Sequence, residues 1–270
     1  MNEIEKNEGN SLNSPSRINV IIKAMHIINL FDNSQSEWSL AQLSNESGYP
    51  KSTIFGILRT LEEEGYIERV NNTQNYRLGL KFLEKSFYVR SSLPIIQYAM
   101  PLLEELNSTI EQNVYLTTHR NGRLLFLESS LLGRQHIKYS VSGKVLPMHC
   151  TGSGKAMMSY MTEEQVKKIV QTWGLTSSTP NTITEYQSLM QELEETRNRG
   201  YAVDNEEESF GVKCIATAIR NAQGQPVGCV SISGSIFSVT AEKVVGYAEQ
   251  LSKISSVLSE YANLFPVRYL

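Results

Sequence analysis

The sequence predicts an α+β fold in two domains, a helix-turn-helix with a β-hairpin wing and then a larger domain built on an antiparallel sheet. The chain has 270 residues, more than a typical single domain of about 100–200. Two short helical patterns, joined by a turn that contains Gly48, precede a pair of strand-like segments. Beyond residue 93, strand-like runs paired by tight turns alternate with helical runs, which favours helices packed on an antiparallel sheet.

The N-terminal residues come before the first regular pattern. Residues 1–16 are rich in Asn, Ser and Glu and have no apolar period, so we expect a disordered tail. From Val20 to Phe31, apolar residues recur at helical spacing, which predicts the first amphipathic helix.

The helix-turn-helix is predicted from its end signals. Ser39 can cap a short helix, and Gly48 can end it in the left-handed conformation. Tyr49–Pro50 forms a tight corner, and a second helix begins at Lys51 and stops at Gly65. The apolar residues of this second helix that should face inward are Ile54, Ile57, Leu58 and Leu61.

A wing and a linker are predicted next. Residues 66–70 and 75–78 alternate as strands do and are separated by turn formers, and helical spacing returns in residues 80–92. The predicted division of the chain is a tail at 1–16, a winged helix-turn-helix at 17–80, a linker helix at 81–92 and a second domain at 93–270.

The second domain is predicted from alternating element types. Asn121–Gly122 is a strong hairpin signal between two strands, because a tight hairpin turn needs two residues with positive φ. We expect helices at residues 95–106, 152–161, 163–172, 185–199 and 241–265, and strands at 114–119, 124–128, 136–141, 201–204, 214–219 and 227–233.

The charge of the chain excludes indiscriminate binding to nucleic acid, since such affinity comes from Lys and Arg that neutralise phosphates. The net charge is −3. Residues 17–90 hold nine basic and eight acidic residues, a balance of 9 − 8 = +1, which leaves −3 − 1 = −4 for the remainder. Charge alone therefore does not identify a DNA-binding protein.

Targeting, metal and cofactor signals are lacking in the sequence. No apolar run approaches the roughly 20 residues of a membrane span, and the N-terminus has no signal-peptide pattern, so we expect a cytoplasmic protein. Cys150, Cys214 and Cys229 form no Cys-x-x-Cys pair, which fits reduced thiols, and the histidines show no zinc-ligand spacing. We expect neither a metal nor a cofactor.

The second helix of the helix-turn-helix carries the side chains that would read DNA. A recognition helix presents its N-terminal residues to base edges in the major groove, and a wing can reach the backbone or the minor groove. The candidate DNA-binding residues are Lys51, Ser52, Thr53, Phe55 and Arg59 on the helix and Tyr76 and Arg77 on the wing. An ordinary helical hairpin with a solvated polar face, or an adaptor that binds another protein, remains open.

Several ordered motifs in both domains identify a family. They are Leu40–Leu43, Tyr49–Ile54, Leu58–Ile67, Tyr76–Gly79, Leu146–Ala156, Arg199–Glu207, Gly211–Ala216 and Ser231–Gly234. The chain resembles the IclR family of bacterial transcription regulators from Arg17 to about Leu258. This resemblance implies a winged-helix domain, a linker helix and a GAF-like effector domain, with dimers or dimers of dimers on a palindromic operator.

The resemblance also implies an effector pocket and one departure from the family. Residues implied for the pocket are Gly152, Ser153, Asp204, Val212, Cys214, Ser231 and Ser233. Phe55–Gly56 stands where family members usually carry a polar pair such as His-Arg. The base contact often made there is therefore absent, or is replaced by apolar contact with a thymine methyl group.

The segment Thr151–Ala156 is the candidate anion site. It opens a predicted helix, where backbone N–H groups flanked by glycines can hold a carboxylate. Leu146, Met148 and Val212 would form apolar walls. The alternative is that the glycines only permit tight packing of a turn. Glu206–Glu208 is expected to be a solvated loop.

The main alternative to a transcription regulator is an enzyme. His149, Cys150, Cys214 and Asp204 supply the residue types of a nucleophile, a base and an orienting group. No nucleophile elbow, paired acid-base motif or cofactor fingerprint accompanies them, so a regulator that binds DNA and a small carboxylate is favoured.

Overall fold

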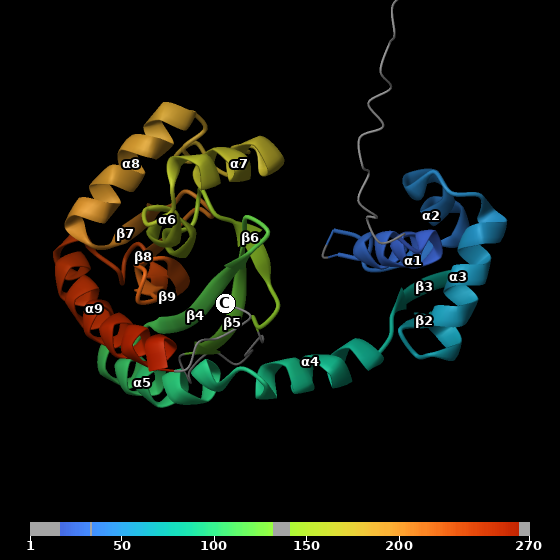
Figure 1. Cartoon of the computed structure of the whole chain (residues 1–270), viewed down its shortest axis with the longest axis horizontal. Coiled ribbons are helices and arrows are strands. Elements are labelled where there is room, and N and C mark those ends of the chain that lie inside the picture. The colour runs from blue at the N-terminus through green and yellow to red at the C-terminus, as the bar shows by residue number, and fades with distance from the viewer. Residues whose placement is uncertain (1–16, 33, 132–140, 265–270) are drawn as a thin grey trace, which may run out of the picture. The chain divides into compact units, whose positions relative to one another are not determined.

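The computed structural model describes residues 17–32, 34–131 and 141–264. The chain divides into two compact units, one ending at Val89 and the other beginning at Arg90 (Figure 1). The predicted tail at residues 1–16 lies outside the described residues. Within the described ranges, no helix has the length and apolar character of a membrane span.

The first unit combines a helix-turn-helix with a small antiparallel sheet of strand order β1-β3-β2, in which β1 precedes the helix-turn-helix and β2 and β3 follow it. Ser39 caps α2 and Gly48 ends it with φ +71°, as the sequence predicts, and Gln42 completes a capping box with Ser39. Its elements are α1 (Asn19–Asn29), β1 (Trp38–Ser39), α2 (Leu40–Ser47), α3 (Lys51–Glu63), β2 (Ile67–Arg69), β3 (Asn75–Leu78) and most of α4 (Lys81–Ser91), whose last two residues belong to the second unit.

One apolar cluster holds this unit together. It joins α1, α2 and α3 to the wing through Ile27, Phe31, Trp38, Leu43, Ile54, Leu58, Ile67 and Tyr76. Because Ile54 and Leu58 lie one turn apart, they bury one side of α3 and leave the opposite side exposed. This packing fixes which residues of α3 a partner can reach.

The second unit contains a six-stranded antiparallel sheet with strand order β6-β5-β4-β9-β8-β7. Asn121 and Gly122 both have positive φ, as the predicted hairpin between β4 and β5 requires. Its elements are α5 (Pro94–Ile110), β4 (Asn113–Arg120), β5 (Arg123–Ser130), β6 (Val145–Pro147), α6 (Gly152–Met158), α7 (Glu163–Trp173), α8 (Tyr186–Arg199), β7 (Ala202–Asn205), β8 (Val212–Arg220), β9 (Pro226–Ser235) and α9 (Ala241–Leu264).

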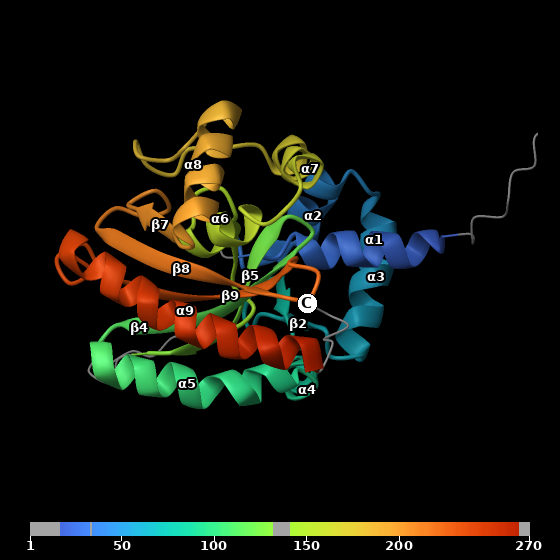
Figure 2. The ribbon, with the colours of Figure 1, turned by 60° about the vertical axis from the view of Figure 1, so that its left-hand side comes forward.

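Helices cover both faces of this sheet (Figure 2). Strand alternation sends Ile215 and Ile232 toward α5 and α9, and sends Ala216 toward α6, with α7 and α8 packed beyond it. Cys214, two residues from Ala216, therefore faces the α6 side. The layers are those of the α+β domain that the sequence predicts.

Some element predictions need correction. The short strands β1 and β6 were not predicted, and α6 ends at Met158 rather than at 161. The predicted strand at residues 136–141 lies outside the described residues except for Val141, which belongs to no strand.

Candidate functional site

The exposed face of α3 carries the predicted DNA-reading side chains. Lys51, Ser52 and Arg59 are exposed, Thr53 is half-buried, and Phe55 is 46% exposed. The Arg59 Nε donates to Glu63 Oε1 at 2.9 Å, one helical turn away. A polar face with one aromatic ring is thus available on this helix.

The two wing residues differ in what they can do. Tyr76 is only 5% exposed and packs in the core with the Arg69 guanidinium 5.2 Å from its ring centre, so its predicted DNA contact is wrong. Alternation along β3 turns Tyr76 inward and Arg77 outward. Arg77 is exposed and pairs with Glu68 Oε2 at 3.2 Å, so it stays a candidate.

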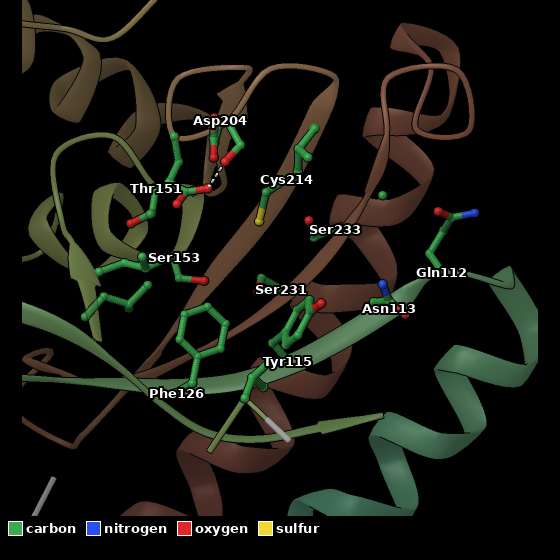
Figure 3. Close-up of a pocket in the computed structure, with 18 of the residues that line it drawn as sticks. Gln112, Asn113, Tyr115, Phe126, Thr151, Ser153, Asp204, Cys214, Ser231 and Ser233 are labelled. Carbon is green, nitrogen blue, oxygen red and sulfur yellow. Dashed lines mark hydrogen bonds between the residues drawn. The ribbon is translucent and has the colours of Figure 1, made fainter. Parts of the chain in front are cut away.

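A cavity of about 700 Å³ lies on the α6 side of the large sheet (Figure 3). It is bounded by β4, β5, β8, β9, the start of α6 and the loop after β7. Its lining is Glu111, Gln112, Asn113, Tyr115, Leu124, Phe126, Val141, Lys144, Leu146, Thr151, Gly152, Ser153, Asp204, Glu208, Ser209, Val212, Cys214, Ser231, Ser233, Gly234, Ser235 and Ser238. Its polar part consists mainly of hydroxyl and amide groups with a few charged side chains, and its apolar part comes from β5, β6, β8 and Val141.

All but one of the residues predicted for the effector pocket line this cavity. Met148 is the exception and is corrected. Its side chain is 1% exposed and packs in the core with Met157 and Leu193, so it forms no wall of the cavity.

The two glycines at the start of α6 lie in different surroundings. Gly152 lines the cavity, where an added Cβ would lie 3.2 Å from the Cys214 sulfur. At Gly154 an added Cβ would lie 2.2 Å from the Met148 carbonyl oxygen, so this glycine serves close packing. The Thr151 Oγ1 caps the helix by accepting from the Gly154 N–H at 3.2 Å.

Asp204 is the most buried carboxylate of the cavity wall, with 4% exposure. Its Oδ1 accepts a hydrogen bond from the Glu207 N–H at 2.8 Å. Burial raises the pKa of Asp204 to about 7, and the nearby charge of Glu207 adds to this, whereas that hydrogen bond and Lys155 lower it. Asp204 can therefore change its protonation near neutral pH.

Behind the cavity lies a buried ion-pair network that sequence analysis missed. Lys155 is 1% exposed, and its Nζ lies 2.5 Å from Glu207 Oε1 and 3.4 Å from Glu192 Oε1. Arg199 pairs with Glu192 at 2.8 Å. Glu207 is buried and Glu208 lines the cavity, so the expectation of a solvated loop is wrong for both. In the sequence, Lys155 follows two glycines at the start of a predicted helix, and nothing in this pattern indicates that its side chain is buried.

The enzyme hypothesis requires an activated nucleophile, and neither Cys150 nor Cys214 is one. Burial raises the pKa of the Cys150 thiol to about 12 and also raises that of Cys214, so both stay protonated at neutral pH. The His149 Nε2 lies 3.1 Å from the Thr176 carbonyl oxygen. Among the residues that the structure describes, no three His, Cys, Asp or Glu side chains are grouped as a metal site.

Comparison with known proteins decides the family. The IclR helix-turn-helix domain matches residues 20–71, and the bacterial transcriptional regulator IclR C-terminal domain matches residues 87–260. The chain belongs to the IclR family of transcription regulators. Thus α3 lies in the DNA-binding helix-turn-helix of this family, and the cavity lies in its C-terminal effector-binding domain.

Individual relatives agree over nearly the whole chain. The HTH-type transcriptional regulator XynR of Escherichia coli K12 is 30% identical over 242 residues, covering 90% of this chain and 96% of that protein. The transcriptional repressor IclR of the same strain is 27% identical, covering 88% and 87%. An IclR homologue of Microbacterium hydrocarbonoxydans complexed with 4-hydroxybenzoate shares the fold, with a TM-score of 0.72 at 18% identity, covering 89% and 98%.

Proposed function

We propose that the protein is a cytoplasmic, sequence-specific transcription regulator and not an enzyme. It binds a palindromic operator as a dimer or a dimer of dimers, and a small carboxylate in the cavity modulates that binding. The observation that carries this proposal is that one IclR-family chain holds both an exposed polar face on α3 and a polar cavity of about 700 Å³ in its second unit.

The DNA-binding part of the proposal assigns roles along α3. Lys51 at its start is suited to a phosphate, and Ser52 and Thr53 are suited to phosphates or bases. Arg59, two turns further along, can reach a guanine or a phosphate once it leaves Glu63. Arg77 on the wing supplies a further phosphate contact.

Replacing Arg59 with Ala should weaken operator binding by about 1–3 kcal/mol if Arg59 contacts a base, because the bidentate contact is lost. The measurement is a gel-shift titration on DNA flanking the gene, at fixed low salt. Lys167→Ala, an exposed change on α7, is the matched control and should leave the affinity unchanged. Equal affinity of the Arg59 variant and the wild type would remove Arg59 from the interface.

The effector part of the proposal rests on the donors of the cavity. The hydroxyl groups of Ser153, Ser231 and Ser233 and the ammonium of Lys144 can donate to a carboxylate, while Asp204 can accept from a hydroxyl of the same ligand. Leu146 and Val212 exclude water around it. For the ligand to act as a switch, it must bind one arrangement of the dimer better than another.

A carboxylate should bind the cavity about tenfold more weakly at pH 8 than at pH 6. With a pKa of about 7, Asp204 is mostly protonated at pH 6 and mostly ionised at pH 8. An anion held beside it repels the ionised form, so binding takes up a proton and weakens as the pH rises through 7. Burial is the largest cause of this pKa, and the groups that shift it further are Glu207, Lys155 and Glu208; the thiols of Cys214 and Cys150 also lie near Asp204.

Titration calorimetry checks this with an acid chosen by thermal-shift screening of small metabolic acids. Asp204→Asn mimics the protonated carboxyl, so the variant should bind that acid equally well at pH 6 and pH 8. A wild-type affinity that is the same at both pH values, or a variant that keeps the pH dependence, would show that the acid does not lie beside Asp204.

A further inference from the structure

Phe55 and Gly56 form an apolar ring and a notch side by side on the exposed face of α3. Phe55 is 46% exposed, and Gly56 is exposed. Positions three, four and seven residues apart share one face of a helix, so Ser52, Phe55, Gly56 and Arg59 lie together. The ring and the notch therefore sit between polar side chains proposed to touch DNA.

Among residues 17–32, 34–131 and 141–264, no packing contact accounts for a glycine at this place. A Cβ added at Gly56 would meet no atom of these residues within 4 Å, and Gly56 is not among the glycines with positive φ. A glycine in the interior of a helix is less favourable than an alanine, since it has more conformational freedom to lose. The missing side chain thus costs stability without serving the packing of the described residues.

The occupant that fits this face is the edge of a thymine in the major groove. Its C5-methyl is the apolar group that the bases present there, and apolar side chains including Phe contact it. Glycine is typical of sites where a backbone must come close to a ligand. If α3 enters the major groove, the exposed ring of Phe55 can contact the thymine methyl group. The missing side chain at Gly56 leaves room for the base edges to approach the helix backbone.

We propose that Phe55 contacts the C5-methyl of a thymine in each operator half-site, and that Gly56 lets the base edges approach the backbone of α3. This rests on the proposed DNA binding. It makes Phe55 a specificity-determining residue and gives each operator half-site a preferred thymine.

The first test measures both the thermal stability and the operator affinity of the Gly56→Ala variant. This variant should have a higher melting temperature than the wild type and yet bind the footprinted operator at least tenfold more weakly, because the added methyl keeps the bases away. Gly246→Ala is the matched control. Gly246 is also exposed within a helix with nothing within 4 Å, but in the second unit, so its variant should gain stability and keep full affinity.

The second test removes only the methyl group from the DNA. Each operator thymine is replaced in turn by uracil, and affinity is measured for the wild type and for Phe55→Ala. One thymine in each half-site should show a loss of about three- to fivefold with the wild type, the effect of burying about one methyl group. The loss should vanish in Phe55→Ala, which marks the two groups as coupled.

The outcomes separate this inference from the function on which it rests. If the wild type binds no flanking DNA, the proposed function fails. If the wild type binds but Gly56→Ala binds equally well, or no thymine methyl is coupled to Phe55, the inference alone is overturned.

Discussion

Replacing Lys155 with Met should lower the free energy of unfolding of the second unit by about 3–5 kcal/mol. Lys155 is almost fully buried and neutralises Glu207, whose Oε2 is buried with no hydrogen-bond partner among the described residues. Without the lysine, Glu207 is left as an uncompensated charge inside the protein. Urea unfolding followed by circular dichroism measures the change.

Two further variants show whether the buried charge causes the loss. Lys155→Met combined with Glu207→Gln removes both charges and should recover a large part of the stability. Lys167→Met, at an exposed position on α7, should leave the midpoint nearly unchanged. If Lys155→Met is no more destabilising than Lys167→Met, the buried ion pair does not stabilise the second unit.

Gly154→Ala should destabilise the second unit by about 3 kcal/mol or more and abolish effector binding. The new methyl group would lie 2.2 Å from the Met148 carbonyl oxygen and 2.4 Å from the Met148 Cα. These are backbone atoms of the segment between β6 and α6, so relief of the clash requires α6 to move relative to this segment and displaces the residues of α6 that line the cavity.

Thermal unfolding and calorimetry with the screened acid provide the two readouts. Gly246→Ala is again the control and should raise the stability by about 0.5–1 kcal/mol, since it lies open within α9. A Gly154→Ala variant with a wild-type melting temperature and wild-type affinity would mean that α6 does not need this close approach.

Local sequence signals predicted much of the fold because their physical causes are local. The cap at Ser39, the left-handed Gly48 and the hairpin at Asn121–Gly122 each act within a few residues. The short strands β1 and β6 gave no such signal. Each has two or three residues and exists because a partner strand, β3 or β5, lies beside it.

Burial was harder to predict than the elements themselves. The apolar period from Val20 to Phe31 predicts a buried stripe, yet Val20, Ile21 and Met25 are about half exposed or more, while Ile27 and Phe31 are buried. Periodicity gives the side of a helix, but the extent of its partner decides how much of that side is covered. The inward turn of Tyr76 likewise depends on β3 pairing with β1 and β2.

The residues of the candidate site that share one face of a strand were predicted from the sequence. The buried ion pairs between residues far apart in the sequence were not. Cys214, Ser231 and Ser233 face one cavity because of strand alternation. From the sequence alone, Lys155 is expected at the surface. Its partners Glu192 and Glu207 lie 37 and 52 positions further along the chain, and only folding brings them next to it. No local pattern contains that information.

The most direct test of the regulator proposal is footprinting of the wild-type protein on DNA flanking its gene, with and without the screened acid. We expect a protected palindrome whose half-sites lie one helical turn or a multiple of it apart, with binding that weakens steeply as salt rises and shifts when the acid is added. No protection of any flanking fragment at low salt, or protection that the acid leaves unchanged at saturating concentration, would contradict it.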